Sequence, residues 1–372
     1  MSIFLFLKQF VDMIYTWKWL DVAMVILVVG MLAYQYLLIR PDIKSSIRPA
    51  DVVVLLLMLL LSVSFLRDVS AYQAYIKVMS AFLLYFMGRL YYDRILECDD
   101  ALSLSSYLII YINFIYRLFV FGIRFFSVTN ANGDLYYYDT DMAYAMILAF
   151  IFIAMFARNS VFKYVTMLLV CPYMIFWSDA DIQQLMFVLI FIVLLIYIVE
   201  IALRKRAFAM ASMAILLVLL VSCVVFIHLP MITMNSDGIR NLFDEKPFLN
   251  FTNMESRYSD WQSVFDIRKP TSVIEMLFGI SFNTTLPLRS FYLKAFFTTG
   301  VVGIILGIVL IALTFIAATK NEERKSFYVT IMLAILMLGS GVTVNTMETT
   351  QMSWFMMLFA GMVISAKDKS ME

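Results

Sequence analysis

Long apolar runs alternate with short polar connections along almost the whole chain. A helix needs roughly 20 such residues, at 1.5 Å each, to cross a hydrocarbon core about 30 Å thick. Because lipid offers no hydrogen bonds, each run must satisfy its own backbone groups, which favours helices. A β-barrel strand would alternate apolar and polar residues at every second position, and these runs do not. The pattern therefore predicts an all-α polytopic membrane protein.

Roughly 11 runs, within a range of 10–12, are predicted to be transmembrane helices. They are residues 21–39, 51–67, 73–90, 103–127, 142–157, 164–178, 185–203, 208–227, 295–318, 328–346 and 352–366. Residues 1–20 are expected to form an interfacial helix or a short extra span. The one long polar interruption, at 229–292, is interpreted as a large loop within a single integral membrane domain, 1–372.

Lysine and arginine are distributed unequally between the two sets of alternate connections. One set contains Arg40, Lys44, Arg48, Arg89, Arg94, Arg158, Lys163, Arg204, Lys205, Arg206, Lys320, Arg324, Lys325, Lys367 and Lys369. The opposite set, with the N-terminus, contains Lys8, Lys18, Arg67 and Arg124. Since short cytoplasmic loops carry the positive excess, the first set is predicted to be cytoplasmic. The loop 229–292 is then extracytoplasmic, and its segment 272–280 is apolar enough to form a short helix on the membrane.

Composition agrees with a membrane protein and narrows its chemistry. Hydrophobic residues make up 63% of the chain and charged residues 15%, whereas a soluble domain has about 25% charged residues. A net charge of +1 gives no global field for nucleic acid. One histidine and three scattered cysteines offer no metal-ligand spacing. We therefore expect no metal and no cofactor.

Several cations lie on the predicted outer side, against the usual bias. They are Arg67, Lys77, Arg117, Arg124, Arg257, Arg289 and Lys294. Each could reach lipid headgroups or pair with an outer aspartate. Arg117 and Arg124, however, share one face of a predicted span, where a buried charge costs about 2.5–3.5 kcal/mol. A guanidinium group can donate bidentate hydrogen bonds to two phosphate oxygens. The sequence therefore predicts a diphosphate-binding pocket formed by Arg117, Arg124, Arg257 and Arg289.

Acidic residues form a complementary outer set. Asp139 and Asp141 precede the span 142–157, and Asp179 precedes the span 185–203. Transfer of a sugar to a hydroxyl group requires a base or an orienting polar group, so these three are candidate catalytic residues. Ordinary solvated carboxylates are the alternative for each. His228, at the end of a span, is interpreted as a boundary residue rather than a base.

Three segments resemble the Wzy/O-antigen ligase superfamily of bacterial membrane enzymes. GDLYYYDTDMAYAMILAF, from Gly133, resembles the family's acidic turn and following helix. Arg257 and Trp261 form its Arg-x-x-x-Trp pattern. MLFGISFNTTLPLRSFYLKAFFTTGVVGIILG resembles its glycine turn and glycine-rich helix, with Arg289 where the ligases carry histidine. The stretch from Ser178 to Asp181 lacks the family arginine, which weakens any transfer of a role to Asp181.

This resemblance implies a metal-independent membrane glycosyltransferase of GT-C-like fold. Its expected activity is that of an O-antigen or capsule polymerase at the outer face of a bacterial inner membrane. It would transfer an undecaprenyl-diphosphate-linked glycan to a lipid-linked repeat unit, with a chain-length regulator as a further partner. An O-antigen ligase acting on the lipid A core of lipopolysaccharide is the first alternative. A lipid-linked oligosaccharide flippase is the second, although two related halves with midplane polar groups are not evident.

Overall fold

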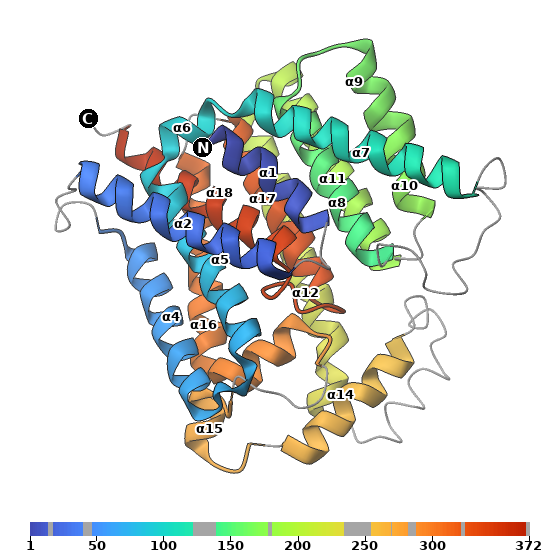
Figure 1. Ribbon diagram of the computed structural model, residues 1–372. Helices are drawn as coiled ribbons and strands as arrows, with labels where there is room; N and C mark the ends of the chain where they lie inside the picture. Colours follow the sequence, from blue (N-terminus) through green and yellow to red (C-terminus); the bar gives the residue numbers. More distant parts are fainter. Residues whose placement is uncertain are drawn as a thin grey trace.

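The computed structural model is helical wherever it describes the chain (Figure 1). The described residues are 1–13, 18–39, 47–121, 139–177, 181–233, 254–268, 270–281, 288–320 and 324–369. Within these ranges no β-strand occurs, which confirms the all-α prediction. In Figure 1, α7 runs at a steep angle to α4, so the helices do not form one parallel bundle.

A helix occurs at each predicted span. The single helices are α2 (Lys18–Ile39), α4 (Pro49–Arg67), α5 (Tyr72–Leu90), α7 (Asp99–Phe121), α8 (Asp139–Phe156), α11 (Asp181–Leu203), α12 (Arg206–Thr233), α16 (Phe291–Lys320), α17 (Arg324–Ser340) and α18 (Thr350–Lys369). The run 164–178 is instead divided into α9 (Val161–Val165), a π-helical turn (Thr166–Val170) and α10 (Cys171–Trp177). Pro172 explains the division, because it has no N–H to continue the α-helical ladder.

Shorter helices connect or cover the long ones. They are α1 (Ser2–Met13), the 3-10 helix η1 (Val69–Ala71), α6 (Tyr92–Leu96), α14 (Met254–Arg268) and α15 (Val273–Phe278). Both α14 and α15 belong to the predicted outer loop, and α15 confirms the short helix expected there. The loop boundaries differ slightly from the prediction, because α12 continues to Thr233 and α16 already begins at Phe291.

Among the described residues, five helices are long and apolar enough to cross a membrane. They are Trp19–Leu38, Pro49–Arg67, Ile182–Leu203, Arg206–His228 and Phe291–Lys320. Their outer faces expose large hydrophobic side chains, such as Ile26 (67% exposed) and Ile215 (62%). A soluble monomer rarely exposes such large apolar surfaces, whereas lipid solvates them readily. These helices indicate a multi-pass membrane protein.

The core lies between three helices that are buried almost all the way round. They are α8, α17 and α18, whose apolar side chains form one continuous cluster. On α17, each residue from Ser326 to Ser340 is buried. Helices α2, α4 and α12 surround this core and leave one apolar face outward. This inner and outer arrangement explains why all of these helices are apolar, although only some of them would touch lipid.

Helix α1 buries charged side chains together with its apolar residues Phe4 and Leu5. Lys8 and Asp12 form an ion pair inside the protein, and the Lys8 side chain is only 1% exposed. Ile3 and Leu7 point outward. An interfacial helix would turn its charged side chains to water, whereas α1 packs them against the protein.

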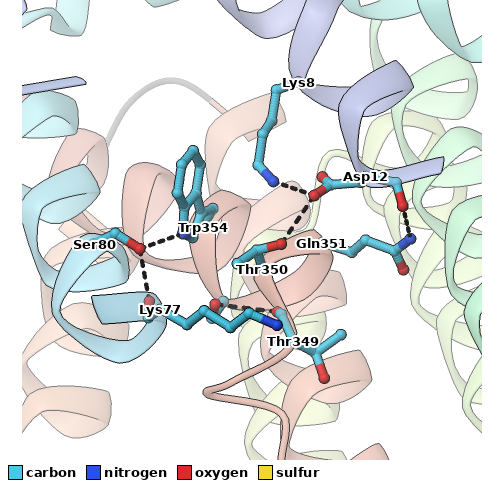
Figure 2. A network of polar contacts seen from close by, with 9 residues as sticks. Lys8, Asp12, Lys77, Ser80, Thr349, Thr350, Gln351 and Trp354 are labelled. Carbon is cyan, nitrogen blue, oxygen red and sulfur yellow. Dashed lines mark hydrogen bonds and ion pairs between the residues drawn. The ribbon is translucent and has the colours of Figure 1, made fainter. Parts of the chain in front are cut away.

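Figure 2 shows how this ion pair ties α1 to α18 and α5. Thr350 donates a hydrogen bond to Asp12 Oδ1 (3.0 Å), and Lys8 Nζ lies 4.1 Å from the centre of the Trp354 ring. The Trp354 Nε1–H in turn donates to Ser80 Oγ (2.9 Å) on α5. The N-terminal helix is thereby fastened to the centre of the fold.

A kink in α16 holds α15 in place. Gly300 has φ +64° and ψ −165°, which breaks the helix and leaves the Phe297 carbonyl free to accept from Ile280 N (2.7 Å). A Cβ on Gly300 would lie 2.4 Å from the Leu277 carbonyl oxygen, so the two backbones touch only because a glycine is present. Arg67, at the end of α4, donates to the carbonyls of Gly279 and Ile280 and closes the arrangement.

Replacing Gly300 by alanine should destabilise the protein by at least about 1–3 kcal/mol, because this backbone conformation is essentially restricted to glycine. Gly307→Ala on the same helix is the matched control, since a Cβ there would meet nothing within 4 Å. Thermal unfolding in detergent should separate the two variants clearly. Equal midpoints would contradict the assignment of strain to Gly300.

Candidate functional site

The candidate site lies where α14 meets the end of α12 and the start of α16, in the lower part of Figure 1. Trp261 of α14 is buried beside Val224 of α12, and beside Leu293 and Phe297 of α16. This small apolar cluster is separate from the main core and holds α14 against the long helices. The predicted loop thus contributes an ordered helix to the site.

His228 is part of a buried polar pair at this junction. Its Nδ1 lies 2.8 Å from the Val224 carbonyl, which can only accept, so Nδ1 carries the hydrogen of the neutral ring. Its Nε2, 3.1 Å from Ser290 Oγ, therefore accepts from that hydroxyl group. The ring stacks on Trp261 with centroids 5.1 Å apart and meets the Tyr292 ring edge-on. These contacts fix the ring with its basic nitrogen turned toward Ser290.

Arg289 lies within electrostatic reach of Arg257. Arg257 projects from α14 and donates to the Thr343 carbonyl (2.9 Å), in the turn between α17 and α18. Burial lowers the pKa of the Arg257 guanidinium, and the nearby positive charge of Arg289 lowers it further. Arg289 itself is exposed. Two neighbouring cations, one of them half-buried, are electrostatically unfavourable and would be stabilised by an anion.

The start of α8 and the start of α11, both predicted to face outward, complete the site. Tyr144 on α8 is buried, lies within electrostatic reach of Arg257, and accepts a hydrogen bond from Gln183 Nε2 of α11 (2.6 Å). Asp139 and Asp141 are in the first turn of α8, about one turn before Tyr144. The backbone therefore brings the predicted acidic segment toward the arginines, although the side chains of both aspartates lie outside the described residues.

The side chains of three other predicted site residues lie outside the described part of the chain. Arg117 belongs to α7, but its side chain is outside the described part of the chain. Arg124 and Asp179 also lie outside the described ranges. Of the predicted site residues, only Arg257 and Arg289 can therefore be followed to their side chains, and they lie within electrostatic reach of each other.

Two more of the predicted outer cations have structural partners. Arg67 donates to backbone carbonyls of the α15–α16 connection. Lys294, on the first turn of α16, pairs with Glu348 across 3.8 Å. Neither contact is with one of the outer aspartates expected as partners, and both separate Arg67 and Lys294 from Arg257 and Arg289.

Sequence reasoning did not identify Ser290, Tyr144, Gln183 or Thr343 as parts of the site. The three-residue spacing from Asp141 to Tyr144 was the one available signal, because it places both residues on one helix face. His228 and Ser290 are 62 residues apart, and only the fold joins them. His228, predicted to be a boundary residue, is buried and hydrogen-bonded on both ring nitrogens.

Comparisons with protein-family models, curated proteins and solved structures found no match to this chain. The superfamily resemblance therefore remains a prediction. The function of this chain is therefore inferred from the site itself and from the membrane character of the helices.

Proposed function

We propose that this chain is a polysaccharide polymerase of the Wzy type, spanning the cytoplasmic membrane of a bacterium eleven times. Its substrates are two polyprenyl-diphosphate-linked glycans. The bond between the donor sugar and its diphosphate breaks, and a hydroxyl oxygen of the acceptor repeat unit forms the new glycosidic bond. The acceptor proton passes to a base, and polyprenyl diphosphate leaves as the anion.

The observation that carries this proposal is the arginine pair. Arg257 is half-buried and lies within electrostatic reach of both Arg289 and Tyr144, near helix ends that are predicted to face outward. A departing diphosphate gains negative charge as its bond to the sugar breaks, and fixed cations stabilise that charge selectively. Arg117 and Arg124 are proposed to extend the same pocket.

Two kinds of group are available to take the acceptor proton. Asp139, Asp141 and Asp179 remain the proposed carboxylates, and the first two begin the helix that carries Tyr144. The His228–Ser290 pair adds a second candidate, because its unprotonated Nε2 is already directed at a hydroxyl group. Most of the rate gain would come from holding two lipid-anchored substrates in reactive geometry.

Contacts between helix ends support the proposed topology. Polar contacts that join predicted cytoplasmic ends are Arg89 to Asp51 (3.1 Å), Lys325 to Asp99 (3.1 Å) and Arg324 to Glu200 (3.6 Å). Contacts that join predicted outer ends are His228 to Ser290, Arg257 to Thr343 and Lys294 to Glu348. Reversing one helix in the membrane would place such partners on opposite sides, so the pairs support the proposed grouping of helix ends, and the extracytoplasmic placement of the loop 229–292 rests on the lysine and arginine distribution.

Deletion of the gene in its host, followed by electrophoresis of the surface glycan, tests the proposal against its alternatives. A polymerase deletion should leave single repeat units on the lipid core. Loss of all surface glycan with intact lipid-linked polymer would indicate a ligase instead. Accumulation of precursor on the cytoplasmic face would indicate a flippase. An unchanged ladder would exclude all three activities.

A further inference from the structure

Helix α14 carries a carboxylate, that of Asp260, within electrostatic reach of Arg257. The two residues are three positions apart, so they are neighbours on the helix surface, with Cβ atoms about 5–6 Å apart. Burial and Arg289 lower the pKa of the Arg257 guanidinium, whereas the negative charge of Asp260 raises it. One helix of the outer loop thus presents a cation and an anion in adjacent positions.

The buried side of α14 fixes how the helix is rotated. Tyr258, Trp261 and Val264 recur at intervals of three residues and pack in one cluster with side chains of α12 and α16. The Tyr258 hydroxyl group also donates to the Ile227 carbonyl of α12. Asp260 lies outside this cluster and is exposed. Its carboxylate is therefore held at the accessible edge of the site, where a substrate hydroxyl group can reach it.

Other carboxylates on the predicted outer side already stabilise local structure. Asp68 accepts from Ser70 (2.7 Å), Glu275 accepts from Thr271 (2.9 Å), and Glu348 pairs with Lys294 (3.8 Å). In the described part of the chain, by contrast, no hydrogen bond reaches the Asp260 carboxylate, and Ser263 donates to its backbone carbonyl instead (2.7 Å). The Asp260 carboxylate can therefore accept from a substrate without giving up a hydrogen bond to a described residue.

The geometry points to Asp260 as the general base that takes the proton of the acceptor hydroxyl group, an inference that rests on the proposed function. The acceptor oxygen bonds to the donor sugar carbon as that carbon's bond to the diphosphate oxygen breaks. The hydroxyl proton passes to the Asp260 carboxylate, while Arg257 stabilises the negative charge on the departing diphosphate. Asp260 then returns the proton to water.

The spacing of the two side chains suits this single displacement. Reacting atoms approach to about 3–3.5 Å, and a base lies about 2.6–3.2 Å from the hydroxyl oxygen that it deprotonates. The base therefore belongs roughly 6 Å from the reacting carbon, on the side opposite the leaving group. Asp260 follows Arg257 by about 4.5 Å along the helix axis and is rotated by about 60° around it. A short carboxylate and a long guanidinium that diverge in this way can reach opposite sides of one sugar carbon.

The test compares Asp260→Asn with the parent protein, both purified at full length and assayed for polymerisation in vesicles. Turnover should fall about 100-fold or more, because general base catalysis commonly contributes that much. Binding of labelled polyprenyl diphosphate should change less than about twofold, because Arg257 and Arg289 remain. Asp260→Glu keeps a carboxylate and should recover part of the lost turnover. Glu275→Gln is the matched control in the same outer loop and should keep the parent turnover, since glutamine can still accept from Thr271.

Parent-like turnover in Asp260→Asn would overturn the assignment of the base and leave the polymerase intact. Loss of turnover together with loss of polyprenyl diphosphate binding would also overturn it, because Asp260 would then act only through Arg257. A parent protein that does not lengthen the glycan would reject the polymerase and this inference with it. Matching elution on size exclusion verifies that the variants are folded.

Discussion

Arg257→Ala should reduce polymer synthesis by about 100-fold or more, measured as the glycan ladder formed at equal protein level. The guanidinium is held by the Thr343 carbonyl beside Arg289, where it can stabilise the charge that develops on the departing diphosphate. Removing one such fixed donor commonly costs about 100- to 1,000-fold in rate. The effect should appear mainly in turnover rather than in protein abundance.

Two further variants make this result specific. Arg257→Lys keeps the positive charge but loses the planar group that can donate bidentate hydrogen bonds. Its activity should therefore lie between that of Arg257→Ala and that of the parent protein. Arg158→Ala is the control, because Arg158 is 89% exposed and its pairing with Asp100 is a surface contact. If Arg257→Ala made polymer of full length at normal protein abundance, the result would contradict the proposed diphosphate-binding pocket.

Asp12→Ala should cost about 3–5 kcal/mol of stability, the largest stability effect expected in this chain. Lys8 would then keep a buried charge without its carboxylate, in a site that also holds Trp354. Thermal unfolding in detergent can be followed by the reactivity of the buried thiols of Cys98 and Cys171, with the exposed Cys223 replaced by serine. The midpoint should fall by many degrees.

The double variant Lys8→Met, Asp12→Leu separates charge burial from packing. Because it removes both charges, it should be more stable than Asp12→Ala alone. Asp100→Ala, which breaks the exposed pair with Arg158, should change stability by at most about 1 kcal/mol. If the double variant were the least stable of the three, the buried ion pair would not be the cause.

The helices could be predicted closely because lipid imposes one simple requirement on them. A run such as 51–67 must be helical and apolar, and α4 (Pro49–Arg67) matches it within two residues. The orientation of α1 could not be predicted, since its polar face is explained by partners more than 300 residues away, Thr350 and Gln351. Amphipathic pattern alone does not say whether a polar face meets water or protein.

The site was predictable in its charges but not in its geometry. Arg257 and Arg289 are expected to lie near each other because both are cations on the predicted outer side. Lysine and arginine are less frequent on that side, so their presence there indicates a function. The roles of His228 and Ser290 depend on how α12 meets the start of α16, which no local sequence pattern encodes. The π-helical turn between α9 and α10 and the kink at Gly300 likewise follow from single residues acting within a packed structure.

The most direct measurement of the central claim is polymerisation by the purified protein in vesicles. The substrate is a polyprenyl-diphosphate-linked repeat unit, supplied without metal or other cofactor, and the products are resolved by electrophoresis. The account predicts a ladder of lengthened lipid-linked glycans and release of polyprenyl diphosphate, both lost in Arg257→Ala. Unlengthened substrate with folded, membrane-inserted protein would contradict the account.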